Sequence, residues 1–554
     1  MLSEQPVLGA RGMVACAHYL ATQAGISILN QGGNAIDAAI AANITTTVVY
    51  PSTCSAGGDI FMLIWDAKTQ QLYALNGSGR APQGMTPEYF QSHNMREIPA
   101  RGPLSITVPG AVDGWFTALQ RFGSLPVETI FAPAIGFAED GVPVTPKLST
   151  WLNRAAESVL GVWESSAGVF MPHGKPFRTG EVLRQLNLAL TYRTLAKEGR
   201  DAFYRGPIAR TITDYVQQCG GVLAMTDMEQ HHSDWVEPIS TNYRGYDVYE
   251  FPPNSQGIAA LEMLNILEGY DLKSLGYQTA EYLHLFLEAK KLAFADRDHY
   301  ISDPVFVDIP VDQLLSKGYA TQQRARINSQ RATAYVAAGL EREGDTMYLC
   351  TADKEGNIVS LIQSLYNGFG SGIVGGDTGV LLQNRGSYFS LDPRHVNYLQ
   401  PGKRTMHTLT PAMVLKDRKP YLALGSMGGD AQPQIHVQLL SAILDFGMNV
   451  QQAISAPRWR SSRVRGTAAH KGQEVGGQRG IDEHRERKII EAVMLERRFM
   501  SGVALQLDLL GHYTIVEGPW EDGMGHAQAI RINPNTHIFE GAADPRCDGL
   551  ALGL

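Results

Sequence analysis

The sequence predicts an α+β fold, in which helices and strands occupy largely separate stretches of the chain. Residues 110–300 carry mostly helical patterning, whereas strand-like alternation dominates after residue 346. Hydrophobic residues make up 44% and charged residues 18% of the 554 positions, a composition that can bury a large core. We therefore expect a globular protein rather than a disordered chain.

Bulk properties exclude several classes of partner. The net charge of −8 gives no basic field for a nucleic acid, and no run approaches the roughly 18 apolar residues that a membrane-spanning helix needs. The N-terminus carries an acid, Glu4, where a secretory signal would carry bases. The five cysteines are scattered and never form a C-x-x-C pair, which suits a reducing compartment without a disulfide frame or zinc site. We expect a cytoplasmic protein without a metal or cofactor.

The first elements are two helices and a strand. Helical patterning over 17–29 is broken at 31–34, and the alanine-rich stretch 35–42 begins a second helix. Small alanine faces allow such helices to pack closely on a sheet or on each other. A tight loop over 51–58 then leads into an apolar strand at 60–65.

The long helical region ends at Asp303-Pro304, because the residue before a proline is disfavoured in a helix. Between Val305 and Gly344 the chain becomes polar and rich in glutamine, arginine and glutamate. This composition indicates an exposed connection, which is a suitable place for a processed chain end.

Strands follow the connection. Residues 347–352 and 358–362 flank a glycine-containing turn at 353–357 and predict a β-hairpin, with Thr346 at the start of its first strand. Further strands are predicted at 413–415, 421–425 and 527–532, with helices between them. Residues 460–498 are rich in Arg, Lys, Glu, Gly and His, so we expect a solvated surface insertion there.

The motif that carries chemistry is Gly344-Asp345-Thr346, followed by the hairpin and by the glycine-rich stretch 368–376. A threonine at a strand start is ordinary by itself, since its branched side chain suits a pleated surface. The stretch 370–375 satisfies G-x-G-x-x-G, but it lacks the downstream acid of a dinucleotide site. The sequence contains no H-E-x-x-H, G-x-S-x-G or P-loop motif.

Several further motifs occur in a characteristic order. They are Gly32-Gly33-Asn34-Ala35-Ile36-Asp37-Ala38, Gly57-Gly58-Asp59, Val108-Pro109-Gly110, Ala293-Phe294-Ala295-Asp296-Arg297, Lys403-Arg404, Gly425-Ser426-Met427-Gly428-Gly429 and Asp544-Pro545-Arg546. Together with Asp345-Thr346 they make the chain resemble the γ-glutamyltransferase family over most of its length. The resemblance implies an αββα sandwich of the N-terminal-nucleophile hydrolases. It also implies a precursor that cleaves itself into residues 1–345 and 346–554.

The same resemblance implies the catalytic residues. Thr346 attacks the Asp345 carbonyl in the precursor, and cleavage frees an α-amine that then serves as the base for its own hydroxyl. Gly428 and Gly429 match the pair whose backbone amides stabilise the oxyanion, although a plain turn is the alternative. Ser364 matches the supporting hydroxyl residue, although a strand serine with its hydrogen bonds satisfied is the alternative.

The resemblance is weakest at the positions that bind substrate. Where the family has an arginine, an asparagine, a glutamine, an aspartate and paired serines, this chain has Ser78 (with Arg80 nearby), Tyr366, Arg385, Tyr388, and His407 with Thr408. The loss of an acid and the gain of Arg385 suit a substrate carboxylate rather than an ammonium group. Arg385 as a mere strand cap is the alternative. The pattern looks more like the subgroup that includes oxamate amidohydrolase, and it is also similar to cephalosporin and glutaryl acylases.

We therefore expect hydrolysis of a small carboxylate-bearing amide, with oxamate to oxalate and ammonia as the specific hypothesis. The alternatives are γ-glutamyl hydrolysis or transfer, acylase activity, and an unprocessed binding protein that retains only the fold. The expected partners are the two chains of one precursor and a small amide, and the resemblance leaves a dimer of such heterodimers open.

Overall fold

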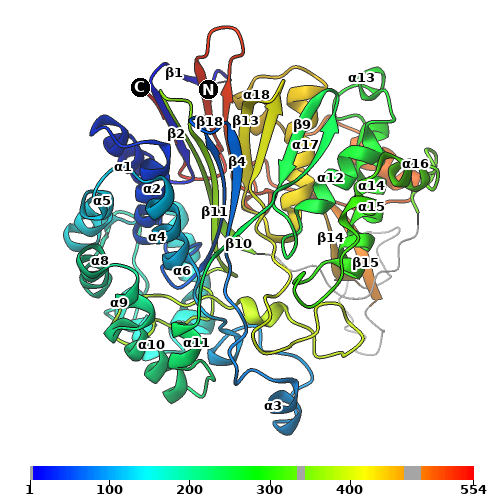
Figure 1. Ribbon diagram of the computed structural model, residues 1–554. Helices are drawn as coiled ribbons and strands as arrows, with labels where there is room; N and C mark the ends of the chain where they lie inside the picture. The colour runs from blue at the N-terminus through cyan, green and yellow to red at the C-terminus, as the bar shows by residue number, and fades with distance from the viewer. Residues whose placement is uncertain (1–3, 334–343, 467–487) are drawn as a thin grey trace.

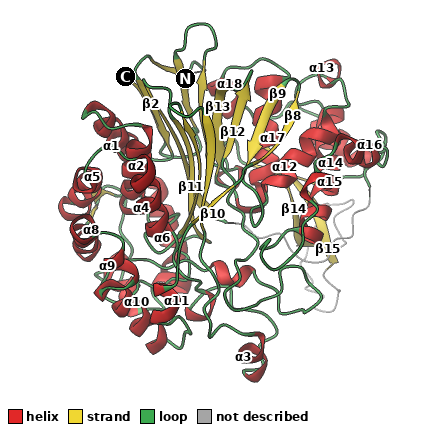
Figure 2. Ribbon diagram, in the orientation of Figure 1, coloured by secondary structure: helices red, strands yellow, loops and turns green. Residues whose placement is uncertain are grey.

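Two seven-stranded sheets lie face to face between two layers of helices in the computed structural model (Figures 1 and 2), which describes residues 4–333, 344–466 and 488–554. The αββα sandwich implied by the resemblance is confirmed. Both chain ends lie at the same edge of the sandwich, where the Ala10 amide donates to the Leu554 carbonyl.

The first sheet contains the predicted hairpin at its centre. Its order is β19-β2-β10-β11-β3-β4-β7, with β2 Gly12–Cys16, β3 Asp59–Asp66, β4 Gln71–Gly77, β7 Asp234–Val236, β10 Asp345–Asp353, β11 Ile358–Tyr366 and β19 Leu550–Gly553. All its pairs are antiparallel. The hairpin prediction is confirmed, because β10 and β11 pair across a short turn.

The second sheet carries the later predicted strands. Its order is β1-β18-β17-β13-β12-β9-β8, with β1 Val7–Gly9, β8 Ile239–Tyr243, β9 Tyr246–Glu250, β12 Ala412–Lys416, β13 Lys419–Ser426, β17 Ala527–Ile532 and β18 Phe539–Ala543. The strands predicted around 413–415, 421–425 and 527–532 are confirmed.

Alternating side chains of β10 serve two separate cores. Met347 and Leu349 pack with the first helical layer, whereas Tyr348 and Cys350 pack between the sheets against residues such as Met413. This alternation is the ordinary two-residue period of a strand. Thr346 therefore lies on the face that is turned toward the second sheet.

Helices α1 and α2 cover the outer face of the first sheet. The Asn34 side chain accepts from the Asp37 amide while the Asp37 carboxylate accepts from the Asn34 amide, a capping box that starts α2. The layer comprises α1 Tyr19–Asn30, α2 Ala35–Val49, α4 Ala111–Phe122, α5 Val127–Asp140, α6 Pro146–Ala155, α7 Glu164–Phe170, α8 Leu186–Glu198, α9 Asp201–Tyr204, α10 Pro207–Gln218 and α11 Met225–Glu229. A short strand pair, β5 Val142–Pro143 and β6 Val182–Leu183, lies among these helices, and α3 Pro87–Ser92 stands apart below the sheets (Figure 1).

The outer face of the second sheet is covered by α12 and α17, and α14 packs on α12. This layer comprises α12 Gly257–Leu267, α13 Leu272–Leu275, α14 Ala280–Tyr300, α15 Val311–Leu314, α16 Lys317–Arg324, α17 Gln432–Leu444, α18 Val450–Ser455 and α19 Val503–Leu510. In the described residues no helix is long and apolar enough to cross a membrane.

The mostly helical patterning predicted over 110–300 is interrupted by strands. Strands β8 and β9 form a hairpin within this stretch, with buried side chains at every second residue and a left-handed Gly245 in the turn. The period-two alternation and the glycine were visible signals for this hairpin. The connection predicted over 305–344 contains two short helices, and its last part, 334–343, lies outside the described residues.

The prediction of a solvated insertion over 460–498 is wrong at both ends of that stretch, where the chain forms strands. Its flanks are β14 Trp459–Gly466 and β15 Lys488–Glu496, which form a third sheet with β16 Thr514–Glu517. Val493 and Leu495 join the core of the second helical layer, and Arg463 is buried in an ion pair with Asp298. Arg463 therefore serves a buried ion pair rather than solvent. Residues 467–487 lie outside the described residues.

Candidate active site

Thr346 lies at an irregular point of the central hairpin. It pairs with Ser364 of β11 and Asp345 pairs with Tyr366, so the register skips Leu365 of β11, opposite the bond that joins Asp345 to Thr346. Such a bulge leaves one residue out of the regular ladder and bends the strand that carries it. Thr346 is 2% exposed. The predicted cleavage site therefore lies opposite a bulge of the neighbouring strand.

Hydrogen bonds link the two hydroxyl groups to the carbonyl of that bond. The Thr346 hydroxyl donates to Ser364 Oγ at 3.2 Å, and Ser364 Oγ donates to the Asp345 carbonyl at 2.6 Å. The Tyr366 amide donates to the same Ser364 oxygen at 2.7 Å. Ser364 thus uses its one donor and both of its acceptor positions. It polarises the carbonyl that Thr346 would attack.

Gly428 and Gly429 form the turn that follows β13. Their φ angles are 144° and 55°, a region that residues with a Cβ rarely adopt. The Gly428 carbonyl accepts from Ala431, and the Gly429 carbonyl accepts from Gln256. Because a trans peptide places its N–H opposite its carbonyl, the bond to the Gly428 carbonyl fixes where the Gly429 amide points. A Cβ built on Gly344 would lie 3.2 Å from the Gly429 Cα, so the turn adjoins the cleavage segment.

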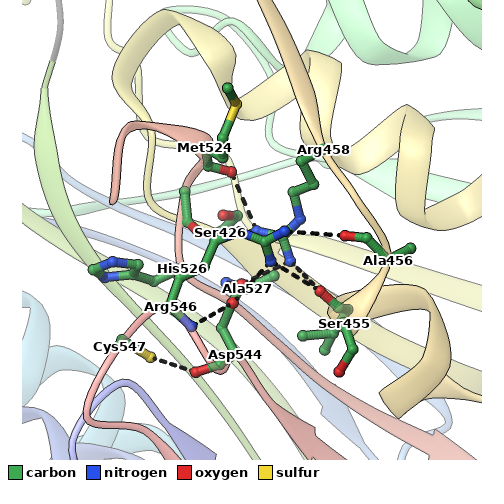
Figure 3. A network of polar contacts seen from close by, with 12 residues as sticks. Ser426, Ser455, Ala456, Arg458, Met524, His526, Ala527, Asp544, Arg546 and Cys547 are labelled. Carbon is green, nitrogen blue, oxygen red and sulfur yellow. Dashed lines mark hydrogen bonds and ion pairs between the residues drawn. The ribbon is translucent and has the colours of Figure 1, made fainter. Parts of the chain in front are cut away.

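Buried ion pairs lie next to this turn, and Figure 3 shows their network around Arg458, Asp544 and Arg546. The Met427 amide donates to the His526 carbonyl, and the Arg458 guanidinium donates to the carbonyls beside it, at Met524 and Gly525. Asp544 pairs with Arg458 at 2.6 Å. Burial alone would raise the pKa of Asp544, but Arg458 and a second arginine lower it to about 2.

That second arginine, Arg546, also pairs with Glu496 of β15, which ties the third sheet to the same network. The motif Asp544-Pro545-Arg546 therefore has a structural role that its sequence alone did not indicate. It anchors the strand ends around the Gly428-Gly429 turn.

Arg385 is a buried cation with unused donors. It is 1% exposed, stacks on the Tyr366 ring at 4.4 Å and donates to the Thr408 hydroxyl at 3.0 Å. Its Nε and Nη2 atoms have no hydrogen-bond partner among the described residues, and Asp59 is 4.0 Å away. Burial lowers the pKa of the Arg385 guanidinium, and Asp59 counteracts this effect. A second anion would satisfy the remaining donors.

His407 and Asp59 form the wall beside Arg385. The Leu409 amide donates to His407 Nδ1, so the ring carries its proton on Nε2 and donates it to Asp59 Oδ2 at 3.1 Å. Burial, with Arg385 nearby, holds the pKa of His407 well below 6.5, and the ring stays neutral. Burial raises the pKa of Asp59 to about 7, although Arg385 opposes the rise.

The structure groups most, but not all, of the predicted substrate-binding residues. Tyr388 lies edge-on to Tyr366, with 5.4 Å between the ring centres, and its hydroxyl donates to Asp430 at 2.8 Å. Arg80 instead pairs with Asp234 at 3.0 Å and faces a separate small cavity. Asp234 and the His232 carbonyl already engage its guanidinium group there, so Arg80 is removed from the candidate substrate site.

A cavity of about 370 Å³ opens beside the cleavage segment. Its wall includes Gly344, Asp345 and Gly428, but none of Arg385, His407, Thr408 and Tyr388. The other lining residues come from distant parts of the chain and include Ser52, Arg101, Trp151, Arg154, Arg460 and Asp522. No local motif marks these residues, and sequence reasoning missed them.

One cluster elsewhere has the composition of a metal site. Ligand atoms of His284, Glu288 and His512 lie within 4.8 Å of one another. However, the two rings are hydrogen-bonded at 2.8 Å, and the Lys291 ammonium group lies 2.7 Å from the Glu288 carboxylate. These contacts already satisfy the groups that a cation would need, so we assign no metal to the cluster.

Comparisons with known proteins agree with this geometry. The profile of the gamma-glutamyltranspeptidase family matches residues 21–554. The chain is 41% identical over 552 residues to the glutathione hydrolase-like YwrD proenzyme of Bacillus subtilis, which covers 99% of both chains. It is 36% identical over 555 residues to the oxamate amidohydrolase proenzyme of Klebsiella pneumoniae, again over 99% of both.

A solved relative extends the comparison to three dimensions. The crystal structure of cephalosporin acylase from Bacillus halodurans matches with a TM-score of 0.89 and 39% identity, over 100% of this chain and 98% of the other. These relatives are named for three different activities, so they do not single out one substrate. The chain is an amidohydrolase of the N-terminal-nucleophile type, and it belongs to the γ-glutamyltranspeptidase family.

Proposed function

We propose that the protein cleaves itself before Thr346 and then hydrolyses a carboxylate-bearing amide, with oxamate as the specific candidate. The observation that carries the proposal is the hydrogen-bonded chain from the Thr346 hydroxyl through Ser364 to the Asp345 carbonyl. This chain places a nucleophile and a polarising donor at the same peptide bond.

Self-cleavage begins with attack of Thr346 Oγ on the Asp345 carbonyl carbon. The acyl group moves from nitrogen to oxygen, and water hydrolyses the resulting ester, which releases the two chains. Ser364 donates to the carbonyl oxygen as negative charge develops on it, and such a donor stabilises the transition state.

The mature enzyme uses the amine that cleavage frees. An α-amine has a pKa of about 7.7–8.0 in model compounds, so at neutral pH it accepts the Thr346 hydroxyl proton. The hydroxyl oxygen attacks the substrate carbonyl, and the backbone amides of Gly428 and Gly429 stabilise the oxyanion. The leaving amine takes the proton from the α-ammonium group, and water then hydrolyses the acyl-enzyme.

Specificity for a carboxylate is assigned to Arg385. Its two unused nitrogens can form a paired hydrogen bond with a carboxylate, and Thr408 and the neutral His407 lie beside its guanidinium group. Oxamate combines a carboxylate with an adjacent amide, and the relative named oxamate amidohydrolase supports this choice.

A γ-glutamyl donor is the second candidate, and the 41% identical relative named glutathione hydrolase-like favours it. Its substrate would carry an ammonium group that needs an acid. Asp430 is an acid near this space, but its carboxylate is engaged by Arg297 and Tyr388. This engagement makes oxamate the first choice.

The test combines chain integrity with turnover. Cleavage before Thr346 divides the 60.5 kDa chain into pieces of about 38 and about 23 kDa on a denaturing gel. Thr346→Ala should stop both cleavage and turnover, and Thr346→Ser should retain slow cleavage because it keeps a hydroxyl. Ammonia release from oxamate is measured beside release of a γ-glutamyl anilide. An active protein that remains a single chain, or an active alanine variant, refutes the mechanism.

A further inference from the structure

Three segments meet at one end of the second sheet. Strands β9, β12 and β13 are antiparallel neighbours, and Ala412 at the start of β12 lies opposite Glu250 at the end of β9 (Figure 2). The segment that follows β9, the segment that precedes β12 and the turn that follows β13 therefore leave the sheet at the same end. These three segments carry Gln256, Thr408 and Gly429, respectively.

The buried side chain of Gln256 joins the other two segments. Its Nε2 group donates to the Thr408 carbonyl and to the Gly429 carbonyl, each at 2.8 Å. Its Oε1 atom accepts from Arg297 Nη1 at 2.8 Å. Because a guanidinium group only donates, Oε1 must face Arg297, and both donors of the amide are then committed to the two carbonyls.

The two carbonyls belong to different parts of the candidate site. Thr408 accepts from Arg385 through its hydroxyl, so its segment borders the group that holds the substrate carboxylate in the proposed reaction. Gly429 supplies one of the two amides that stabilise the oxyanion in that reaction, so its turn holds the amide carbonyl of the substrate. Gln256 is therefore a direct bridge between these two parts.

The side chain of Gln256 matters more for the Gly429 turn than for the other segment. The backbone already ties Gln256 to the segment before β12, because the Gln256 amide donates to the His407 carbonyl at 3.1 Å and the His407 amide donates to the Asn254 carbonyl at 2.8 Å. The carbonyl of Gly429, in contrast, accepts from the Gln256 side chain. A change of this side chain should therefore leave the segment in place and release the turn.

We propose that Gln256 is a positioning residue that sets the spacing between the Arg385 guanidinium group and the oxyanion turn. The inference rests on the proposed hydrolysis of a carboxylate-bearing amide. A fixed spacing favours one separation between the carboxylate and the amide carbonyl of the substrate. Under the proposed function that separation is the one in oxamate, whose two groups lie on adjacent carbon atoms. Succinamate, with two more carbon atoms between these groups, is then disfavoured.

The experiment replaces Gln256 by methionine and by glutamate. Methionine keeps an unbranched side chain of similar length but has no donor. Glutamate keeps an acceptor for Arg297, but its second oxygen meets the Thr408 and Gly429 carbonyls and cannot donate to them when ionised. Self-cleavage is followed on a denaturing gel. For the processed enzymes, kcat and KM on oxamate and on succinamate are measured by ammonia release.

We expect both variants to cleave themselves at the wild-type rate, because that step uses Thr346 and Ser364. On oxamate, kcat should fall at least about tenfold, since displacement of an oxyanion donor weakens transition-state stabilisation. KM should change less than about threefold, because Arg385 still binds the carboxylate. The preference for oxamate over succinamate in kcat/KM should fall about tenfold, a change that a purely structural residue would not cause.

Gln438 provides a matched control. This buried glutamine of α17 also donates through Nε2 to two carbonyls, those of Gln434 and Trp459, and its Oε1 atom accepts from the Trp459 amide. Gln438→Met and Gln438→Glu remove equivalent hydrogen bonds outside the candidate site. Both kcat and the preference for oxamate should stay within about twofold of the wild-type values in these variants.

The outcomes separate this inference from the proposed function. An unchanged kcat in the Gln256 variants, or a fall that is equal on both substrates, overturns the positioning role and leaves the hydrolysis standing. The same losses in the Gln438 variants, or a wild-type enzyme without a preference for oxamate, also overturn it. If neither Gln256 variant cleaves itself while the Gln438 variants do, Gln256 serves the fold and the inference is wrong. A processed wild-type enzyme that hydrolyses neither substrate refutes the proposed function and the inference with it.

Discussion

Replacing Arg385 by glutamine tests how the protein recognises the acyl half of its substrate. Glutamine can still reach the Thr408 hydroxyl as a neutral donor, but it removes the guanidinium group that stacks on Tyr366. The Nε and Nη2 donors that await a carboxylate disappear with it. Self-cleavage should persist, because its bonds involve Thr346 and Ser364 rather than Arg385.

The magnitude follows from the contacts. A hydrogen bond to a charged group contributes about 1.5–3 kcal/mol, so kcat/KM for a carboxylate-bearing amide should fall roughly tenfold to 150-fold. A second effect acts on Asp59, whose pKa Arg385 holds down to about 7. Without that cation the Asp59 pKa rises further, so the carboxyl becomes protonated at neutral pH and His407 Nε2 donates to a neutral acceptor instead of an anion.

The assay measures kcat/KM of the processed variant on oxamate, on the uncharged analogue oxamide and on a γ-glutamyl anilide. Arg80→Gln is the matched control, since Arg80 pairs with Asp234 and lies outside the candidate site. A fall confined to substrates with a carboxylate supports the role of Arg385. A uniform fall on all three substrates, or the same pattern in Arg80→Gln, refutes it.

Substitutions at three further positions test the remaining parts of the reasoning. Ser364→Ala should slow self-cleavage at least about tenfold, because the Asp345 carbonyl loses its donor, whereas Ser364→Thr should cleave faster than the alanine variant in gel time courses. Gly428→Ala places a Cβ at φ 144° and should lower kcat more than about tenfold, and an unchanged kcat contradicts the oxyanion role. Burial lowers the pKa of His18 from 6.5 to about 3, so its neutral ring contributes stability that is complete above pH 6.5 and is lost as the pH falls toward 3. In the uncleaved Thr346→Ala background, His18→Asn keeps the acceptor that caps α1, and urea titrations between about pH 6 and 4 should show a slope shallower by up to about 1.4 kcal/mol per pH unit; equal slopes contradict the assignment.

Local patterns predicted the centre of the fold well. The hairpin around Thr346 was visible because each of its strands alternates between two cores and a glycine-containing turn joins them. The layering of two sheets came from the family resemblance, since a strand pattern does not reveal which strands become neighbours. Strands β8 and β9 were missed although their alternation was readable, because long helices surround them in the chain.

The sequence predicted less of the candidate site than of the fold. Asp345, Thr346 and Ser364 share one hairpin, so their proximity follows from register alone. The cavity joins residues more than 300 positions apart, such as Arg101 and Arg460, and only the folded chain brings them together. The charged stretch at 460–498 misled for a related reason. Arg463 is matched by Asp298, which lies far away in the chain, and a composition does not disclose such a pair.

The order of strands in the first sheet determines whether the two fragments can separate after cleavage. Strand β2 lies between β10 and β19, so a strand from before the proposed cut is hydrogen-bonded on both edges to strands from after it. Once the bond before Thr346 is broken, the fragments stay interleaved and cannot separate without dismantling the sheet. Folding therefore takes place within one chain, before cleavage. After heat or denaturant unfolds the mature enzyme, refolding would require two different polypeptides to associate. The lifetime of the mature enzyme is therefore set by how slowly it unfolds.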